Sequence, residues 1–236
     1  MLKIWLIRHG QTEGNKLGRY IGVTDEPLSP EGAEHLRRLC YPSVEAVFIS
    51  PLLRCVQTAE ILFPDKEPHR IKELAECDFG EFENKNYKEL AGNANYQAWI
   101  DSDGRLPFPK GESREDCRSR NLMGFGEAVD LCIRQGISSA AFVIHGGTIM
   151  NLMEAYCDVK RTFYEWHVAN GCGFAVEIDQ ALWEKGQRIL YLKESVDEEQ
   201  KVAYLKQKLD APVTEEDLEK IVSSIYGLFK NVEGSV

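Results

Sequence analysis

Residues 3–10 read Lys-Ile-Trp-Leu-Ile-Arg-His-Gly, an apolar run that ends abruptly in an arginine, a histidine and a glycine. Residues 44–51 and 140–147 have the same form, an apolar run closed by Ser-Pro in one case and by His-Gly-Gly in the other. Short, nearly all-apolar segments closed by small or turn-forming residues are typical of strands buried on both faces of a parallel sheet. Residues 172–178 and 188–192 predict further strands toward an edge of that sheet.

Helical patterns lie between these runs. The predicted helices cover residues 29 to about 39, the segment that follows Pro51, residues 113–134 and residues 148–156. Ser29 before Pro30 is a favourable helix start, whereas Gly124 and Gly126 are potential breaks in the third helix. Strands that alternate with helices predict an α/β fold, a three-layer sandwich whose mostly parallel central sheet is flanked by helices.

Two segments do not follow this alternation of strands and helices. Residues from about 79 to 112 are rich in aromatic side chains, and we interpret them as an insertion that caps the site rather than as a separate domain. After Leu192 the chain becomes polar, and residues 218–229 then carry an apolar stripe at helical spacing. The sequence therefore predicts a main domain over residues 1–193 and a helical C-terminal extension over 194–236, which packs on the main domain or forms a homodimer contact.

Composition limits the partners. The formal net charge of −10 argues against nucleic acid or an acidic membrane as a partner, and no apolar run approaches the ~18 residues of a membrane helix. The N-terminal segment does not resemble a signal peptide. Seven cysteines without a C-x-x-C pair indicate buried thiols in a reducing cytoplasm. Because no cluster has metal-ligand spacing, we expect neither a metal nor a cofactor.

Charged and nucleophilic side chains follow the predicted strands. Ligands of open parallel sheets bind beyond the carboxyl ends of the strands, where Arg8, His9, Arg54 and His145 are expected to gather. A guanidinium matches two phosphate oxygens and keeps its charge. A neutral imidazole is a good nucleophile near neutral pH. The pattern predicts a site for a small phosphorylated metabolite.

The stretch LIRHGQTEGN at residues 6–15 resembles the signature of the histidine phosphatase superfamily, which includes the cofactor-dependent phosphoglycerate mutases. The similarity continues through residues 22–32, 50–59, 74–83 and 143–147. An Arg-His-Gly tripeptide alone is weak evidence, but the ordered set of motifs covers roughly residues 1–193. The resemblance implies a phosphoglycerate mutase-like fold.

The resemblance also implies roles for individual residues. His9 would accept the phosphoryl group as a phosphohistidine. The expected phosphate-binding residues are Arg8, Asn15, Arg54, His145 and Gly146. Glu76 would protonate the leaving oxygen and then activate water, a role that requires a carboxyl group protonated near neutral pH. Glu81 is the competing candidate. The histidines without such a context, and so without an assigned role, are His35, His69 and His167.

The same motifs are compatible with more than one reaction. Only 68 residues separate Glu76 from His145, a shorter insertion than mutases of this family usually carry, which favours a metal-independent phosphatase over a mutase. Residues 18–25 and 109–113 look like those of α-ribazole-phosphate phosphatases, although broad-specificity, general-purpose phosphatases and sugar-phosphate phosphatases share these motifs. Phe82 and Asn84 depart from the family's usual Trp and Gly. A non-catalytic phospho-ligand sensor or adaptor on this fold is the alternative of another class, but every expected catalytic position is filled.

Overall fold

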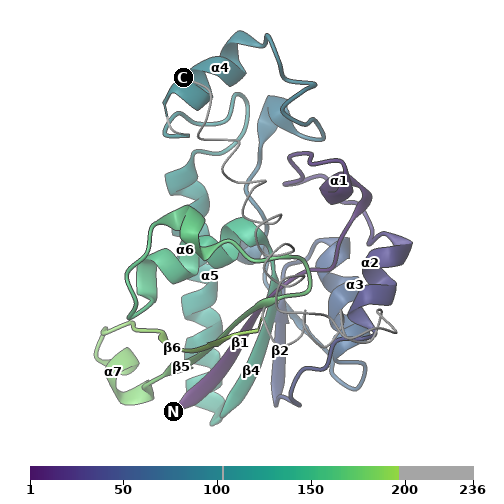
Figure 1. Ribbon diagram of the computed structural model, residues 1–236. Helices are drawn as coiled ribbons and strands as arrows, with labels where there is room; N and C mark the ends of the chain where they lie inside the picture. Colours follow the sequence, from purple (N-terminus) through teal and green to yellow (C-terminus); the bar gives the residue numbers. More distant parts are fainter. Residues whose placement is uncertain (103, 197–236) are drawn as a thin grey trace, which may run out of the picture. The chain divides into compact units, whose positions relative to one another are not determined.

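The computed structural model describes residues 1–102 and 104–196, which belong to a unit spanning Met1–Asp197. Its sheet has the strand order β3-β2-β4-β1-β5-β6. The strands are β1 (Leu2–Arg8), β2 (Ala46–Ile49), β3 (His69–Arg70), β4 (Ser139–Ile144), β5 (Gly173–Ile178) and β6 (Tyr191–Ser195). Strands β1 to β4 pair in parallel, whereas β5 runs antiparallel to β1, and β6 antiparallel to β5. The predicted mostly parallel sheet is confirmed (Figure 1).

Helices cover both faces of the sheet (Figure 1). The α-helices are α1 (Glu13–Lys16), α2 (Pro30–Leu36), α3 (Leu53–Leu62), α4 (Ala94–Asp101), α5 (Arg114–Gln135), α6 (Gly146–Tyr156) and α7 (Gln180–Glu184). The 3-10 helices among the described residues are η1 (Lys72–Leu74), η2 (Gly80–Phe82) and η3 (Phe163–Trp166). Of the helices described, none combines the length and the apolarity that crossing a membrane requires.

Alternate side chains of the central strands pack into two separate cores. On β1, Leu6 belongs to the core that contains residues of α5 and α6, whereas Ile7 belongs to the core that contains residues of α3. On β4, Phe142 and Val143 divide in the same way. Because successive side chains of a strand point to opposite faces, the two cores define the three layers.

Several predicted boundaries differ from the observed ones. The strand predicted from Val44 begins at Ala46, and the helix predicted from about Thr148 begins at Gly146. The helix from Ser29 ends at Leu36 instead of Leu39, because the chain continues in three-residue turns there. The last strand begins at Tyr191 instead of 188. Leu190 is bonded to the end of α6, with its N–H on the carbonyl of Tyr156, so this part of the chain is not available to pair with β5.

Helix α5 runs unbroken through Gly124 and Gly126, both of which are buried. A Cβ atom on Gly124 would lie 2.5 Å from Cβ of Glu73, so glycine here permits close packing against η1. The helix ends at Gly136, whose φ of 69° provides a left-handed cap. The glycines that looked like breaks are therefore packing positions.

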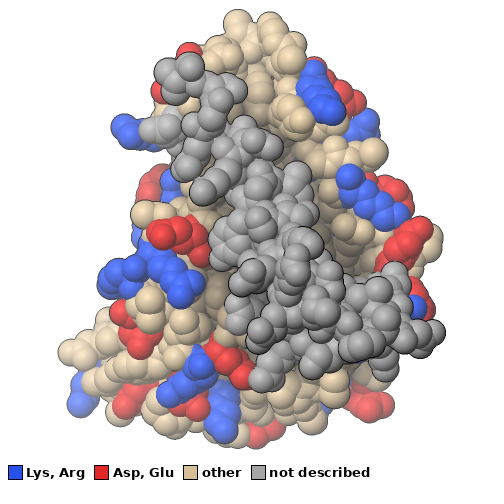
Figure 2. Space-filling model, in the orientation of Figure 1, with Lys and Arg blue, Asp and Glu red and all other residues tan. Residues whose placement is uncertain are grey.

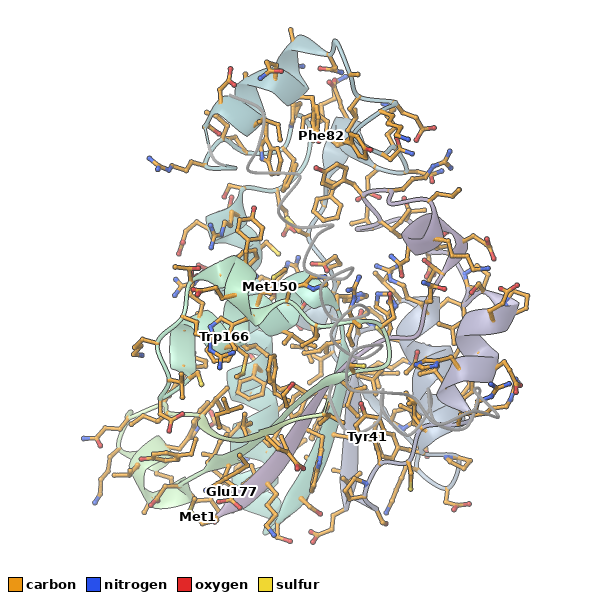
Figure 3. The ribbon with its side chains drawn as sticks, in the orientation of Figure 1. Met1, Tyr41, Phe82, Met150, Trp166 and Glu177 are labelled. Atoms are coloured by element: carbon orange, nitrogen blue, oxygen red, sulfur yellow. The ribbon has the colours of Figure 1, made fainter. Side chains whose placement is uncertain are left out.

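Residues 79–112, called the cap below, contain η2 and α4. Apart from the exposed Tyr87, their aromatic side chains form a cluster of their own around the fully buried Phe82 (Figure 3). Tyr20 and Cys117 join this cluster from outside the cap. The aromatic residues that interrupted the sequence pattern are thus the core of the cap.

The predicted helical extension over 194–236 lies outside the described residues, apart from 194–196. Glu194 and Ser195 complete β6, so the main unit continues beyond the predicted boundary at residue 193. On the described surface visible in Figure 2, basic and acidic side chains are interspersed around the rim, with no large patch of one sign. On this face, therefore, no broad positive patch attracts an anion.

Candidate active site

His9 follows β1 and is buried, with 4% of its surface exposed. Its Nδ1 lies 2.7 Å from the carbonyl oxygen of Gly10. Since a carbonyl can only accept, Nδ1 carries the proton, and the lone pair of the imidazole is on Nε2. Burial, followed by the charges of Arg54 and Arg8, holds the pKa of His9 well below its usual value. His9 is therefore a neutral imidazole that can attack through Nε2.

Arg54 lies in the first turn of α3 and is fully buried. Its guanidinium donates to the carbonyl oxygens of Thr24 at 2.9 Å and Gly22 at 2.8 Å, while its buried Nε has no hydrogen-bond partner. In the described part of the chain Arg54 forms no ion pair. A buried cation without a carboxylate is costly, and an anionic ligand would offset that cost.

His145 follows β4 and is the N-cap residue of α6. It is fully buried, and its ring centroid lies 5.2 Å from that of His9 in an edge-on arrangement. Its Nε2 is 2.7 Å from Oγ of Ser50. Burial and then Arg54 lower the pKa of His145. Helix α6 begins at the next residue, Gly146, where the first N–H groups of a helix favour an anion.

Glu76 is the carboxylate nearest to this helix start. Its Oε2 accepts from the N–H of Gly147 at 3.0 Å, and its Oε1 accepts from the N–H of Cys77 at 3.0 Å. A Cβ atom on Gly147 would lie 2.4 Å from Oε1 of Glu76, so glycine permits this close approach. The residue after Glu76 and the distant start of α6 therefore together fix the carboxylate.

Glu81, the competing carboxylate, lies in η2 of the cap. It forms an ion pair with Lys110 at 2.8 Å, and this contact lowers the pKa of Glu81. Glu76 lines the cavity at the site, whereas Glu81 is not part of that lining. A carboxylate held ionised by a lysine is a poor proton donor, so the geometry favours Glu76.

The cavity has a volume of about 280 Å³ and lies between the cap and the sheet end. The residues of its lining near the strand ends include Arg8, Asn15, Glu76, Gly146 and Gly147. Aromatic residues of the lining include Tyr20, Phe79, Trp99 and Phe108. His9, Arg54 and His145 are buried next to this cavity rather than forming its lining. The predicted site residues other than Glu81 therefore gather at one place.

Two arginines of the cavity have carboxylate partners. Arg19 pairs with Glu89 at 2.9 Å, and Arg114 pairs with Glu154 at 3.3 Å. Their charges are largely compensated. Arg54, buried next to the cavity, differs from these two arginines because no ion pair of the described residues compensates its charge.

Residues before β5 also lie at the site, although no pattern in the sequence pointed to them. Asn170 donates through Nδ2 to the carbonyl oxygen of His9 at 3.0 Å and to Oδ1 of Asn15 at 3.1 Å. His167, to which we assigned no role, lines the cavity with Nε2 3.3 Å from Nη1 of Arg8. Because β5 is antiparallel to β1, its beginning lies where β1 ends. The sequence pattern does not reveal that β5 runs antiparallel to β1, so it could not place these two residues at the site.

Thr58 was also missed. One turn after Arg54 in α3, its Oγ1 accepts from the N–H of Gly10 at 2.9 Å and donates to the carbonyl oxygen of Arg54 at 2.6 Å. It thereby connects the loop after His9 to the helix that carries Arg54. Thr58 could have been predicted from its position four residues after Arg54, because side chains four residues apart share one face of a helix.

Comparison with known proteins agrees with this geometry. A family model described as the histidine phosphatase superfamily (branch 1) matches residues 4–187. The chain is 28% identical over 193 residues to the adenosylcobalamin/alpha-ribazole phosphatase of Escherichia coli (strain K12), with 76% of this chain and 91% of that protein covered. It is 34% identical over 168 residues to the 2,3-bisphosphoglycerate-dependent phosphoglycerate mutase of Rhizobium etli, with 65% and 79% covered.

A solved structure shows the same fold. The alpha-ribazole phosphatase from Shigella flexneri superposes with a TM-score of 0.71 at 25% sequence identity, covering 83% of this chain and 96% of that chain.

Proposed function

Because this chain belongs to the histidine phosphatase superfamily, and so is an enzyme that acts on phosphate esters, we propose that it hydrolyses a phosphomonoester through a phosphohistidine on His9, without a metal ion. One observation carries the proposal: the neutral His9, with its lone pair on Nε2, lies beside the buried and uncompensated guanidinium of Arg54. A phosphoryl dianion is the ligand that both groups require.

In the proposed first step, Nε2 of His9 attacks phosphorus and the bond to the leaving oxygen breaks. Glu76 donates the proton that this oxygen needs. Arg54, Arg8 and the N-terminus of α6 stabilise the charge on the equatorial oxygens. In the second step Glu76 takes a proton from water, the water oxygen attacks phosphorus, and the P–N bond breaks to release orthophosphate.

For the substrate we propose α-ribazole 5'-phosphate or another small organic or sugar phosphate of the cytoplasm. The aromatic side of the cavity, with Phe79 and Trp99, suits a planar ring in the leaving alcohol. Relatives with the ribazole activity in their names cover most of this chain. The seven cysteines are thiols rather than disulfides, which agrees with a reducing compartment.

The proposal is tested by phosphate release in EDTA from a panel of esters. The panel contains p-nitrophenyl phosphate, α-ribazole 5'-phosphate, sugar phosphates and 3-phosphoglycerate with its bisphosphate primer. We expect turnover that survives EDTA, with the highest kcat/KM for α-ribazole 5'-phosphate. Isomerisation of 3-phosphoglycerate faster than any phosphate release would instead establish a mutase, and phosphate binding without turnover of any ester would establish a sensor.

We expect Glu76→Gln to slow hydrolysis of sugar and nucleoside phosphates by roughly 10²–10⁴-fold, because their alkoxide leaving groups require a proton. The effect on p-nitrophenyl phosphate should be much smaller in the first, phosphoryl-transfer step, because p-nitrophenolate leaves without protonation. Rapid-quench measurement of the phosphoryl-transfer step, once with a sugar phosphate and once with p-nitrophenyl phosphate, provides the comparison. Glu81→Gln is the matched control and should retain wild-type rates; a larger loss in that variant would reverse the assignment.

A further inference from the structure

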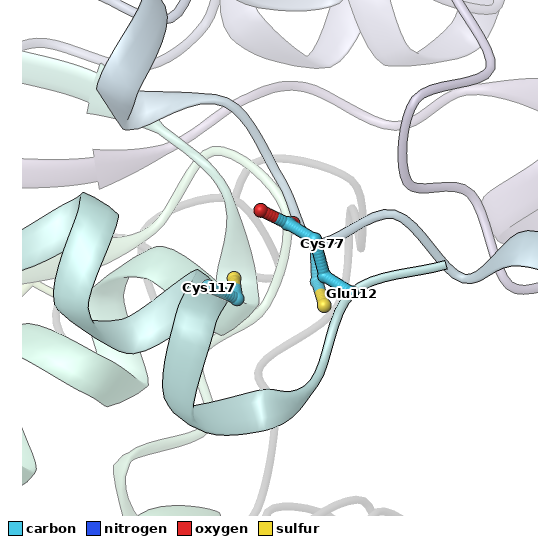
Figure 4. A group of neighbouring side chains, drawn as sticks. All are labelled: Cys77, Glu112 and Cys117. Carbon is cyan, nitrogen blue, oxygen red and sulfur yellow. The ribbon is translucent and has the colours of Figure 1, made fainter. Parts of the chain in front are cut away.

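Three side chains that the mechanism does not use meet at the wall of the cavity. The sulfur atoms of Cys77 and Cys117 and a carboxylate oxygen of Glu112 all lie within 4.8 Å of one another. Figure 4 shows them side by side, with Cys117 on the first turn of α5 and the other two on neighbouring loop segments. Around a tetrahedral Zn²⁺, such ligand atoms are roughly 3.5–3.8 Å apart. Only a small contraction separates this cluster from metal-site geometry.

The backbone holds the two loop segments together. The N–H of Glu112 donates to the carbonyl oxygen of Asp78 at 3.0 Å, and the N–H of Asp78 donates to Oε2 of Glu112 at 3.1 Å. These reciprocal bonds fix Glu112 next to Cys77. The three ligand atoms are therefore assembled by the fold before any ligand binds, which lowers the entropy that binding must overcome.

Arg120 determines the charge of the cluster. It donates to Oε1 of Glu112 from Nε at 2.9 Å and to Oε2 from Nη2 at 2.8 Å. It is also anchored by the carbonyl oxygens of Glu73 and Ala75, each 2.9 Å from its Nη1. With the Asp78 bond, Glu112 accepts three hydrogen bonds, and a carboxylate has about four acceptor positions. One position, on Oε1, remains for a cation.

The charges then balance. Glu112 and Arg120 cancel, and two thiolates cancel a divalent cation, so a loaded site carries no net charge. Neutrality matters because the cysteine side chains are buried, with 7% and 2% of Cys77 and Cys117 exposed. Both cysteines nevertheless line the cavity, which gives a cation a route of entry.

We propose that Cys77, Cys117 and Glu112 bind a thiophilic divalent cation of the Zn²⁺ class, with the fourth coordination position open to the cavity. Binding displaces one proton from each thiol, so that one M²⁺ enters and two H⁺ leave. Because the N–H of Cys77 donates to Glu76, a bound cation holds the proposed acid in place and obstructs the cavity. The cation inhibits hydrolysis, an effect that rests on the proposed function.

The binding test uses Cd²⁺ alone as the probe, added to metal-free protein kept reduced with a phosphine. We expect an ultraviolet thiolate-to-Cd²⁺ charge-transfer band that saturates at one equivalent per chain. Cys77→Ala and Cys117→Ala should each abolish the stoichiometric band, and Glu112→Gln should weaken binding at least about tenfold. Cys132→Ala, which removes a buried thiol from a different core, is the matched control and should retain the band.

A reduced wild-type protein without a saturable band, or a band of unchanged intensity in both Cys77→Ala and Cys117→Ala, would overturn the proposed site. The optical titration needs no turnover, so it decides this site even if none of the esters is hydrolysed. In the activity arm, Zn²⁺ should inhibit wild-type hydrolysis, and EDTA should restore it. Full turnover at full occupancy would refute the inhibitory role.

Discussion

The His9→Ala variant should lose roughly 10⁴–10⁶-fold in kcat for every ester that the wild type hydrolyses. No phosphohistidine can form without Nε2 of His9, and water alone would have to attack a phosphoryl group in a site built for a buried imidazole. The measurement is phosphate release in EDTA by both proteins. Rapid quenching should trap a phosphorylated protein from the wild type and none from the variant.

The controls separate chemistry from folding. His69→Gln changes an exposed histidine of β3 and should retain wild-type turnover. Because Arg54 remains, His9→Ala should still be stabilised by inorganic phosphate in thermal unfolding. If the turnover of His9→Ala stays within tenfold of the wild type, His9 is not the nucleophile. If the wild type loses its turnover in EDTA, the reaction requires a metal ion.

Arg54→Met should lower kcat/KM by roughly 10³-fold or more, the range found when a charged donor to a transferring phosphoryl group is removed. Arg54 provides a fully buried positive charge whose Nε has no partner in the protein. A phosphate ion should raise the melting temperature of the wild type but not that of the variant, because the anion then lacks its buried counter-charge.

Arg54→Lys tests whether the fork of donors or only the charge is needed. A lysine restores charge without the two-pronged contact to the carbonyl oxygens of Gly22 and Thr24, so we expect partial recovery. Arg37→Met, which changes an exposed arginine at the end of α2, is the matched control. If phosphate still stabilises Arg54→Met as strongly as the wild type, Arg54 does not bind the anion.

Local patterns were sufficient for much of the fold. The runs that ended at His9 and His145 are the parallel strands β1 and β4, because an all-apolar strand is stable only where both faces are covered. Ser29 and Ser113 begin α2 and α5 because their side chains accept the bonds of exposed helix N–H groups. Glycine was the least reliable indicator of where a helix ends. Whether Gly124 breaks the helix or allows close packing depends on the residues that lie against it.

Sequence by itself determined which side chains follow the strand ends, since residue types and strand ends are local properties. Arg8, His9 and His145 had to emerge at one edge of a parallel sheet. Tertiary structure alone decided the rest. The antiparallel direction of β5 brings His167 and Asn170 to that edge, although about 160 residues separate them from His9.

Contacts between residues distant in sequence distinguish the two candidate carboxylates and bring the two cysteines together. The sequence favoured Glu76 but left Glu81 as a competing candidate, and the structure separates them because the N–H of Gly147 donates to the first and Lys110 pairs with the second. Cys77 and Cys117 likewise show no metal-binding spacing, yet they meet at one wall of the cavity. Such neighbours are selected by the packing of distant segments, and the free energy of that packing is not encoded in any single stretch of residues.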